Sequence, residues 1–192
     1  IALLGYLSES RGASVLMDVC SRSEGRVQLI VAGDSRPGRL FDTFVASKDV
    51  RFLGKVDRFQ ALRVMRDCHL VALLYDPAVP VNVIAAPNKF YESLMVGTPV
   101  LAADGMRLAT LVKERKLGLI VPYGDVDVTL SAIMTLTDDL LMSQMRAAAR
   151  GHYIDSCTLP HELDRYRMFY RSLACDSWVR NRSEGKDVNH GA

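Results

Sequence analysis

The segment Pro87–Glu92, which reads PNKFYE, combines residue types that could bind an anionic ligand. Proline is favourable at the first position of a helix, so we expect a helix that begins at Pro87. The free N–H groups and partial positive charge at a helix start favour a phosphate group. Lys89 adds a full positive charge in a turn where a cation is otherwise unfavourable. The segment therefore predicts a site for a negative group such as a diphosphate.

Glu92 extends this candidate site. It follows Asn88 by four residues and Lys89 by three, so the three side chains lie near one helix face. A carboxylate there can accept two hydrogen bonds from vicinal hydroxyls, such as those of a ribose. The alternative is a surface helix with an ion pair between Lys89 and Glu92. The position directly after a buried strand favours the ligand site.

A second candidate group lies near the start of the chain, in the segment GYLSESRG. Arg11 can bind phosphate oxygens through two parallel hydrogen bonds. The alternative is a solvated arginine in a loop. Gly5 would allow the backbone to approach a ligand closely, although a glycine that simply ends a strand is equally common.

Short apolar runs alternate with amphipathic segments along the chain, and these elements must position the candidate residues. Strands are predicted at Ile1–Gly5, Val27–Gly33, Val50–Gly54, Leu70–Tyr75, Pro99–Ala103 and Gly118–Pro122. Helices are predicted at Arg11–Cys20, Arg39–Ser47, after a cap at Asp57, and at Pro87–Val96, Arg107–Lys116, Val126–Leu136, Asp138–Arg150 and Pro160–Leu173. A long loop is expected at Asp76–Ala86, and a polar, disordered tail at 174–192.

Alternation of strands and helices, with strands that are almost continuously apolar, predicts a parallel sheet covered on both faces. Right-handed crossovers then give an α/β, Rossmann-like, doubly wound sheet of about six strands in one domain over residues 1–173. A ligand of such a sheet binds beyond the carboxyl ends of the strands. Both candidate groups follow predicted strands, so we expect them at this edge.

Composition and motifs exclude several classes of protein. A net charge of +2 argues against an obligate nucleic-acid binder. Neither GYLSESRG nor AGDSRPG matches the glycine fingerprint of a dinucleotide site or a phosphate-binding P-loop, so an oxidoreductase of that kind is disfavoured. No cofactor and no metal site is expected. The cysteines have neither metal-ligand nor disulfide-framework spacing: Cys20, Cys68, Cys157 and Cys175.

The expected location is cytoplasmic, because the cysteine pattern suits a reducing compartment and neither a signal peptide nor a membrane-spanning run is recognised. Arg58, Arg63 and Arg66 form a basic face on a predicted helix. Such a face is more often solvated than functional, but it could contact anionic lipid at the inner face of a membrane. The chain starts with Ile1 inside an apolar run, so we expect that an N-terminal part is missing.

Taken in order, five phrases resemble the C-terminal domain of the family-4, or group 1, glycosyltransferases, which have the two-domain GT-B architecture. They are LLGYLSESRG, VQLIVAGD, VRFLGKVD, NKFYESLMVGTPVLAAD and GLIVPYGDVDVTLSAI. The resemblance covers Ile1 to Leu173 and is most specific at Asn88–Val100.

The resemblance implies a metal-independent enzyme that moves a sugar from a UDP-, GDP- or other nucleoside diphosphate sugar to an acceptor, usually with retention. The acceptor-binding N-terminal domain would be the missing part, so this chain alone would bind the donor weakly and transfer nothing. Glu92 matches the second glutamate of the family's Glu-x7-Glu motif, which typically holds the ribose. Arg11 matches the basic residue that neutralises the diphosphate, and Val56 falls in the loop that usually meets the nucleobase. Arg11, Lys89 and Glu92 would serve the reaction, with Gly5, Val56 and Asn88 adding to donor binding.

Departures from the family pattern leave other functions open. Ile84 stands where the first motif glutamate usually contacts the donor sugar, and Tyr6 where many members have a second phosphate-binding arginine. Ala86–Pro87 replaces the usual Phe-Gly pair. The pattern resembles a subgroup with Asn-Lys in the motif, where Lys89 supplies positive charge. The alternatives are a degenerate, non-catalytic nucleotide-sugar-binding module and a sugar-nucleotide epimerase of the same architecture.

Overall fold

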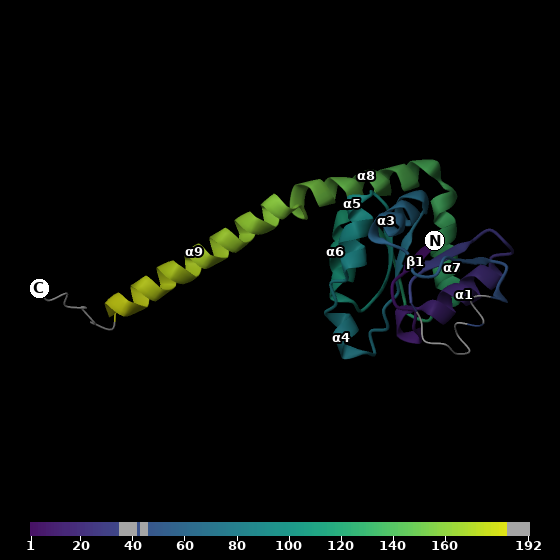
Figure 1. The fold of residues 1–192 in the computed structure, drawn as a ribbon, viewed down its shortest axis with the longest axis horizontal. Helices are drawn as coiled ribbons and strands as arrows, with labels where there is room; N and C mark the ends of the chain where they lie inside the picture. Colours follow the sequence, from purple (N-terminus) through teal and green to yellow (C-terminus); the bar gives the residue numbers. More distant parts are fainter. Residues whose placement is uncertain (35–41, 43–45, 184–192) are drawn as a thin grey trace, which may run out of the picture. The chain divides into compact units, whose positions relative to one another are not determined.

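The computed structural model describes residues 1–34, 42 and 46–183, and from residue 174 onward it describes only the course of the backbone (Figure 1). These residues divide into two compact units, one covering Ile1–Tyr153 and one beginning at Ile154. The candidate site residues all belong to the first unit.

The first unit contains one parallel sheet with the strand order β3-β2-β1-β4-β5-β6. The strands are β1 (Ala2–Leu4), β2 (Leu29–Ala32), β3 (Val50–Phe52), β4 (Val71–Leu73), β5 (Val100–Ala103) and β6 (Gly118–Val121). This arrangement confirms the predicted Rossmann-like α/β fold. Each strand is shorter than its predicted apolar run.

Helices cover both faces of the sheet. The described helices are α1 (Ala13–Arg22), α3 (Arg58–Asp67), α4 (Pro80–Val83), α5 (Asn88–Met95), α6 (Arg107–Arg115), α7 (Val126–Met134), α8 (Asp139–Ser156) and α9 (Leu159–Ser183), with short 3₁₀ turns at η1 (Glu9–Arg11) and η2 (Thr135–Thr137). Helix α1 packs against α7, whereas α3 packs against α5 (Figure 1). Two helical layers therefore enclose the sheet.

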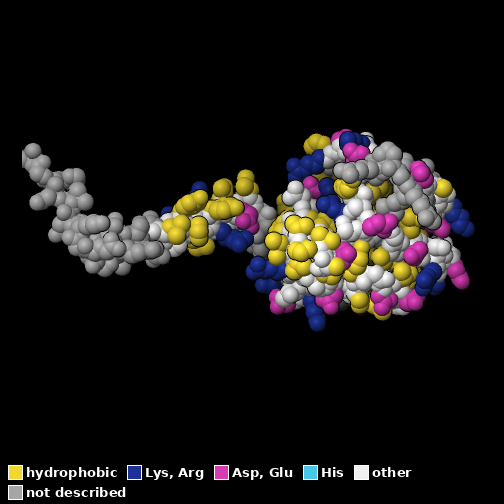
Figure 2. All heavy atoms as spheres, turned by 90° about the horizontal axis from the view of Figure 1, so that it is seen from below, with side chains coloured by type: hydrophobic (Ala, Val, Ile, Leu, Met, Phe, Trp, Pro, Cys, Tyr) yellow, Lys and Arg dark blue, Asp and Glu magenta, His cyan; other side chains and the backbone are white. Residues whose placement is uncertain are grey.

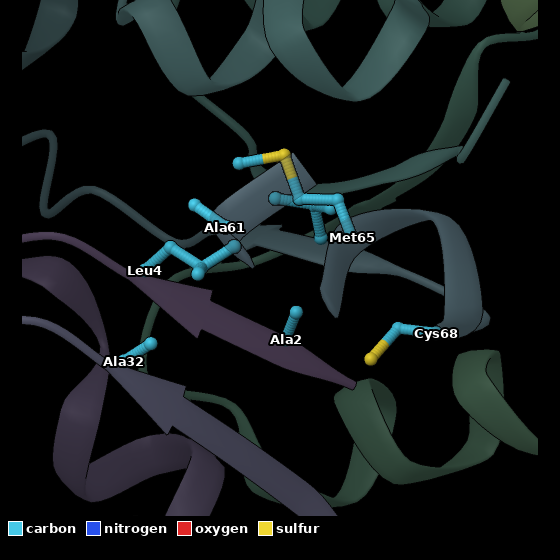
Figure 3. Close-up of a cluster of buried hydrophobic side chains, with 7 residues drawn as sticks. Ala2, Leu4, Ala32, Ala61, Met65 and Cys68 are labelled. Carbon is cyan, nitrogen blue, oxygen red and sulfur yellow. The ribbon is translucent and has the colours of Figure 1, made fainter. Parts of the chain in front are cut away.

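The interior beneath α3 shows how periodicity produces this packing. Ala61 and Met65, four residues apart on α3, lie against Ala2 and Leu4 of β1 (Figure 3). Met65 is fully buried, and complete burial of such a side chain contributes about 1.5–3 kcal/mol. The predicted cap at Asp57 is confirmed as a capping box. Its carboxylate accepts from the Gln60 N–H at 2.8 Å, and its own N–H donates to Gln60 Oε1 at 3.1 Å.

Three predicted helix starts or loops are corrected by the structure. The first helix begins at Ala13, because Gly12 adopts a left-handed backbone (φ +73°) and separates it from η1. Pro87 lies at the N-cap position in extended backbone, so α5 begins one residue later, at Asn88. The expected loop Asp76–Ala86 contains α4, whose first residue is Pro80, a position that suits proline.

The C-terminal helices are longer than predicted. Helix α8 continues past Arg150 to Ser156, and α9 continues past Leu173 to Ser183, so the expected disordered tail is helical over 174–183. No glycine or proline occurs between Pro160 and Ser183, which explains why nothing stops α9 earlier. The compact first unit ends at Tyr153.

The predicted helix Arg39–Ser47 falls mostly on residues 39–41 and 43–45, which lie outside the described residues.

Candidate functional site

The topology identifies one place where a ligand of this sheet would bind. Consecutive strands run outward from β1 in one direction and from β4 in the other, and β1 pairs directly with β4. The loops that follow these two strands therefore diverge at the carboxyl edge, which is where ligands of such sheets bind. Arg11 belongs to the first loop, and Lys89 and Glu92 follow the second.

Backbone contacts between glycines form one side of this edge. The Gly5 N–H donates to the Ala32 carbonyl at 2.9 Å, and the Gly33 N–H donates to the Gly54 carbonyl at 2.9 Å. A Cβ added to Gly33, whose φ is +155°, would lie 1.7 Å from the Gly5 carbonyl oxygen. The loops after β1 and β2 can approach this closely only because Gly33 lacks a side chain. Gly5 thus takes part in a backbone contact within the protein. The sequence had predicted only that its backbone could approach a ligand closely.

Arg11 connects the loop after β1 with the loop after β4. It ends η1, and its guanidinium carbon lies 5.1 Å from the centroid of the Tyr75 ring, directly after β4. Burial raises the pKa of Tyr75, and the positive charge of Arg11 acts in the opposite direction. The guanidinium also lies near the backbone of Gly5. Stacking on a ring leaves the edge of a guanidinium able to donate hydrogen bonds to an anion.

Asn82 attaches the loop after β4 to the loop that carries Arg11. Its amide nitrogen donates to the Asp76 carbonyl at 3.0 Å and to the Ser10 carbonyl at 3.4 Å. The Asp76 N–H also donates to the Ser10 carbonyl, at 2.9 Å. The side chain of Asn82 is buried, and it is the only polar residue within the segment 77–87, PAVPVNVIAAP. Sequence reasoning missed Asn82, although its isolation in an apolar segment was a usable signal.

Lys89 and Glu92 form the ion pair that the sequence analysis considers as the alternative to a ligand site. The Lys89 ammonium donates to Glu92 Oε2 at 2.7 Å, and the two side chains are only 27% and 17% exposed. Arg58, in the first turn of α3, places its Nε 4.0 Å from Glu92 Oε1. One carboxylate therefore lies between two cations at the start of α5.

Helix α5 holds this pair firmly in place. Phe90 and Leu94 are fully buried on its inner face, and Ser93 donates to the Thr98 carbonyl at 2.5 Å. Asn88, the first residue of α5, is exposed. Val56 is partly buried against the core cluster beneath α3. The structure thus brings Arg58, Lys89 and Glu92 together, whereas neither Asn88 nor Val56 has a contact here that fixes a role.

Tyr123, after β6, is a second residue that sequence reasoning missed. Its hydroxyl donates to the Glu9 carbonyl at 2.6 Å. Burial raises the pKa of Tyr123, so its hydroxyl stays protonated and available as a donor. A residue far along the chain thereby supports η1, which ends in Arg11.

Cavities and metal-ligand clusters do not mark this site. A hollow of about 1240 Å³ lies along α6, β6 and α8, and its lining contains neither Arg11 nor the Lys89–Glu92 pair. Among the side chains that the structure describes, those of residues 1–34, 42 and 46–173, no group of three or more metal-ligating residues is found. Within the same part of the chain, no helix is both long and apolar enough to cross a membrane.

Comparison with solved structures agrees with this architecture. Sucrose-phosphate synthase from Thermosynechococcus elongatus is 18% identical with a TM-score of 0.68, and the match covers 91% of this chain and 46% of that protein. The HepE protein of Anabaena in complex with UDP is 19% identical with a TM-score of 0.71, over 88% of this chain and 48% of that one. The C-terminal domain of a group 1 glycosyl transferase from Francisella tularensis is 12% identical with a TM-score of 0.63, over 82% and 85%.

These identities establish a shared fold. The chain spans less than half the length of the first two proteins. A search of curated protein sequences finds no match. The family model described as "Glycosyl transferases group 1" matches residues 1–139, which is most of the chain. The loops after β1 to β5 and all the candidate site residues lie within that match, and the chain therefore belongs to the group 1 glycosyl transferase family.

Proposed function

We propose that this chain binds a nucleoside diphosphate sugar at the carboxyl edge between β1 and β4, for transfer of the sugar to an acceptor. The observation that carries the proposal is the cluster of Arg58, Lys89 and Glu92 at the start of α5, which follows β4, together with the position of Arg11 over Tyr75, which also follows β4. The similar HepE protein has been solved in complex with UDP and with UDP-glucose.

In the proposed complex the diphosphate lies between Arg11 and the first turn of α5. Free N–H groups of that turn and the helix dipole favour the anion. Lys89 exchanges its bond with Glu92 for a bond with a phosphate oxygen. Glu92 then accepts hydrogen bonds from the ribose hydroxyls, while Arg58 still compensates its charge. Asn88 and the backbone around Gly5 and Val56 complete the nucleotide contacts.

The same groups would support the reaction. When the glycosidic bond breaks, negative charge develops on the leaving diphosphate. Arg11, Lys89 and the start of α5 stabilise that charge electrostatically, so the proposal assigns no step to a metal or other cofactor. The acceptor hydroxyl oxygen attacks a centre with oxocarbenium character as the bond to the diphosphate breaks, and its proton passes to an oxygen of the leaving diphosphate, with retention of configuration.

In this proposal, the acceptor binds to a further domain of the same enzyme, which precedes this chain. The enzyme acts in the cytoplasm or at the inner face of a membrane. The chain alone is then expected to bind donor weakly and to transfer no sugar. Measurable transfer by the isolated chain would contradict this part of the proposal.

The test is calorimetric titration of the chain with UDP, GDP and NAD, beside Lys89→Ala and Glu92→Ala. We expect one nucleoside diphosphate to bind and NAD not to bind. Loss of a charged hydrogen bond should weaken binding by about 1–3 kcal/mol in each variant. Arg22→Ala is the matched control, because Arg22 forms an ion pair of similar length with Asp127 (2.8 Å) outside the site. Equal affinities for the parent chain and both site variants would contradict the proposal.

A second function, a non-catalytic nucleotide-sugar-binding module, is favoured by one observation. Ile84 is 69% exposed and offers no hydrogen bond to a sugar. Such a module would bind the nucleoside diphosphate and its sugar conjugate with equal affinity. An enzyme's donor site should distinguish the two ligands, so a titration with UDP and UDP-glucose, or the GDP pair, separates the functions.

A further inference from the structure

The position of Arg11 depends on η1, a turn of only three residues. A 3₁₀ turn of this length has few internal hydrogen bonds, so contacts from outside are needed to hold it. Within the turn, the Arg11 N–H donates to the Ser8 carbonyl at 3.1 Å, and the Gly12 N–H donates to the Glu9 carbonyl at 2.9 Å. Two other parts of the chain supply the contacts from outside.

The first outside contact comes from the segment that follows β4. The Asp76 N–H donates to the carbonyl of Ser10, directly before Arg11, at 2.9 Å. Gly12, directly after Arg11, packs so closely against this segment that an added Cβ would lie 2.5 Å from the Cβ of Leu74. Both residues that flank Arg11 are therefore fixed against the segment after β4.

The second outside contact comes from the turn after β6, through Tyr123. Its hydroxyl donates to the Glu9 carbonyl at 2.6 Å, and this is the same carbonyl that accepts from the Gly12 N–H. A tyrosine hydroxyl has one proton to donate, so this hydroxyl has no second proton to donate to a ligand. Tyr123 therefore acts on the backbone that carries Arg11.

The charges around η1 make a fixed position important for Arg11. Burial raises the pKa of Tyr123, and the charges of Asp76 and Glu9 add to the rise, so both carboxylates lie near its hydroxyl. Figure 2, seen from below and therefore from the side on which α4 lies in Figure 1, shows Asp and Glu side chains among Lys and Arg side chains. Among the side chains that the structure describes, Arg11 forms an ion pair with neither carboxylate, and its guanidinium lies over Tyr75. A guanidinium released from the ring could pair with a carboxylate instead of a ligand.

We propose that Tyr123 is a positioning residue for the donor diphosphate, because its hydroxyl fixes η1 so that the Arg11 guanidinium stays over Tyr75 and can donate to phosphate oxygens. This inference rests on the proposed function, since it takes Arg11 as a ligand of the diphosphate. The turn after β6 thereby contributes to donor binding without donating a hydrogen bond to the donor.

The test is a double-mutant cycle of Tyr123→Phe with Arg11→Met, measured by NMR titration of the isolated chain with UDP and GDP. Phenylalanine keeps the ring and removes only the hydroxyl. For the nucleotide that binds, Tyr123→Phe should weaken binding about threefold to tenfold in the parent chain and leave it unchanged in the Arg11→Met background. Tyr153→Phe is the matched control and should have no effect, because Tyr153 lies beside Arg150 on α8, outside the site.

A second measurement needs no ligand. Burial raises the pKa of Tyr75, and the charge of Arg11 lowers it, so this pKa reports how close the guanidinium lies to the ring. Tyr123→Phe should raise the pKa of Tyr75, by less than Arg11→Met does, and should add no rise in the Arg11→Met background. Ultraviolet titration measures the pKa as the difference from the same chain with Tyr75→Phe. A purely structural role of Tyr123 would not move this pKa.

Either of two results would overturn the inference. They are equal weakening of nucleotide binding with and without Arg11, and an unchanged pKa of Tyr75 in Tyr123→Phe. The two measurements also separate this inference from the proposed function. If neither nucleotide binds to the parent chain, the proposed function fails, and the Tyr75 titration still decides whether Tyr123 positions Arg11. If a nucleotide binds equally well to the parent chain and to Tyr123→Phe, only the role of Tyr123 is removed.

Discussion

The two sides of the carboxyl edge are built from different interactions. On the side of β1, β2 and β3, the loops meet through backbone atoms of Gly5, Gly33 and Gly54. On the side of β4, one backbone bond from the Asp76 N–H to the Ser10 carbonyl is joined by side-chain contacts, with Arg11 over Tyr75 and Asn82 bonded to the same carbonyl. An atom added at a backbone contact forces the backbone to move, whereas a side-chain contact can be removed by substitution without moving the backbone. The glycine side should therefore govern stability, and the β4 side should govern binding.

The largest expected effect is at Gly33. A Cβ there would meet the Gly5 carbonyl oxygen at 1.7 Å, so Gly33→Ala must displace backbone. We expect a loss of more than about 3 kcal/mol in the free energy of unfolding, because overpacking and left-handed backbone strain add. Gly25→Ala is the control. Gly25 has a positive φ of +81° but open space around it, so its loss should be about 1–2 kcal/mol. Urea unfolding followed by circular dichroism measures both, and equal losses would contradict the role of close packing.

Substitution of Asn82 tests whether the contacts on the β4 side also contribute to stability. Asn82→Ala removes two hydrogen bonds that a buried amide donates to backbone carbonyls, and at about 0.5–1.5 kcal/mol for each bond the unfolding free energy should fall by about 1–3 kcal/mol. Asn88→Ala, at an exposed asparagine, should change the unfolding free energy by less than about 0.5 kcal/mol. The same urea unfolding experiment applies. If Asn82→Ala proved as mild as Asn88→Ala, the loop between β4 and α5 would not depend on this amide.

Lys89 should separate stability from binding. Lys89→Met removes an ion pair whose partners are partly exposed, and Arg58 still compensates Glu92, so the unfolding free energy should fall by at most about 1 kcal/mol. Nucleotide binding should weaken measurably because the phosphate loses a cation. Urea unfolding and calorimetry on one sample give both values. A large stability loss with unchanged binding would assign the pair to the structural role that its geometry also permits.

The smallest expected effect is on the titration of Tyr75. Its pKa lies above the ordinary tyrosine value because the ring is buried, and Arg11 moderates that rise. Arg11→Met removes the cation that stabilises the phenolate, so the pKa should rise further. The buried phenol stabilises the fold below its unfolded-state pKa, and that contribution is lost as pH rises through the folded-state pKa. Ultraviolet titration, with Tyr75→Phe to identify the signal, measures the shift; a downward shift would contradict the stacked geometry.

Sequence periodicity predicted the fold well because buried parallel strands are almost continuously apolar. All six predicted strands appear, each trimmed at one or both ends. The apolar residues predicted at helical spacing near the C-terminus do lie on one helix, α9. The sequence did not predict that their side chains are exposed. Periodicity shows which residues share a helix face, and it does not show what that face contacts. The continuation of α8 to Ser156 was also not predicted. Gly151 lies inside this helix, and a single glycine weakens a helix without having to end it.

By itself, the sequence determined the parallel α/β sheet, the cap at Asp57 and the proximity of Lys89 to Glu92, since each depends on residues close in the chain or on a local period. Only the tertiary structure decided that Glu92 lies near Arg58, that Arg11 stacks on Tyr75, and that Asn82 joins two loops. These contacts join residues that are remote in the sequence, and strand order brings them together. The close approach of Gly33 to Gly5 likewise depends on β1 and β2 being neighbours in the sheet.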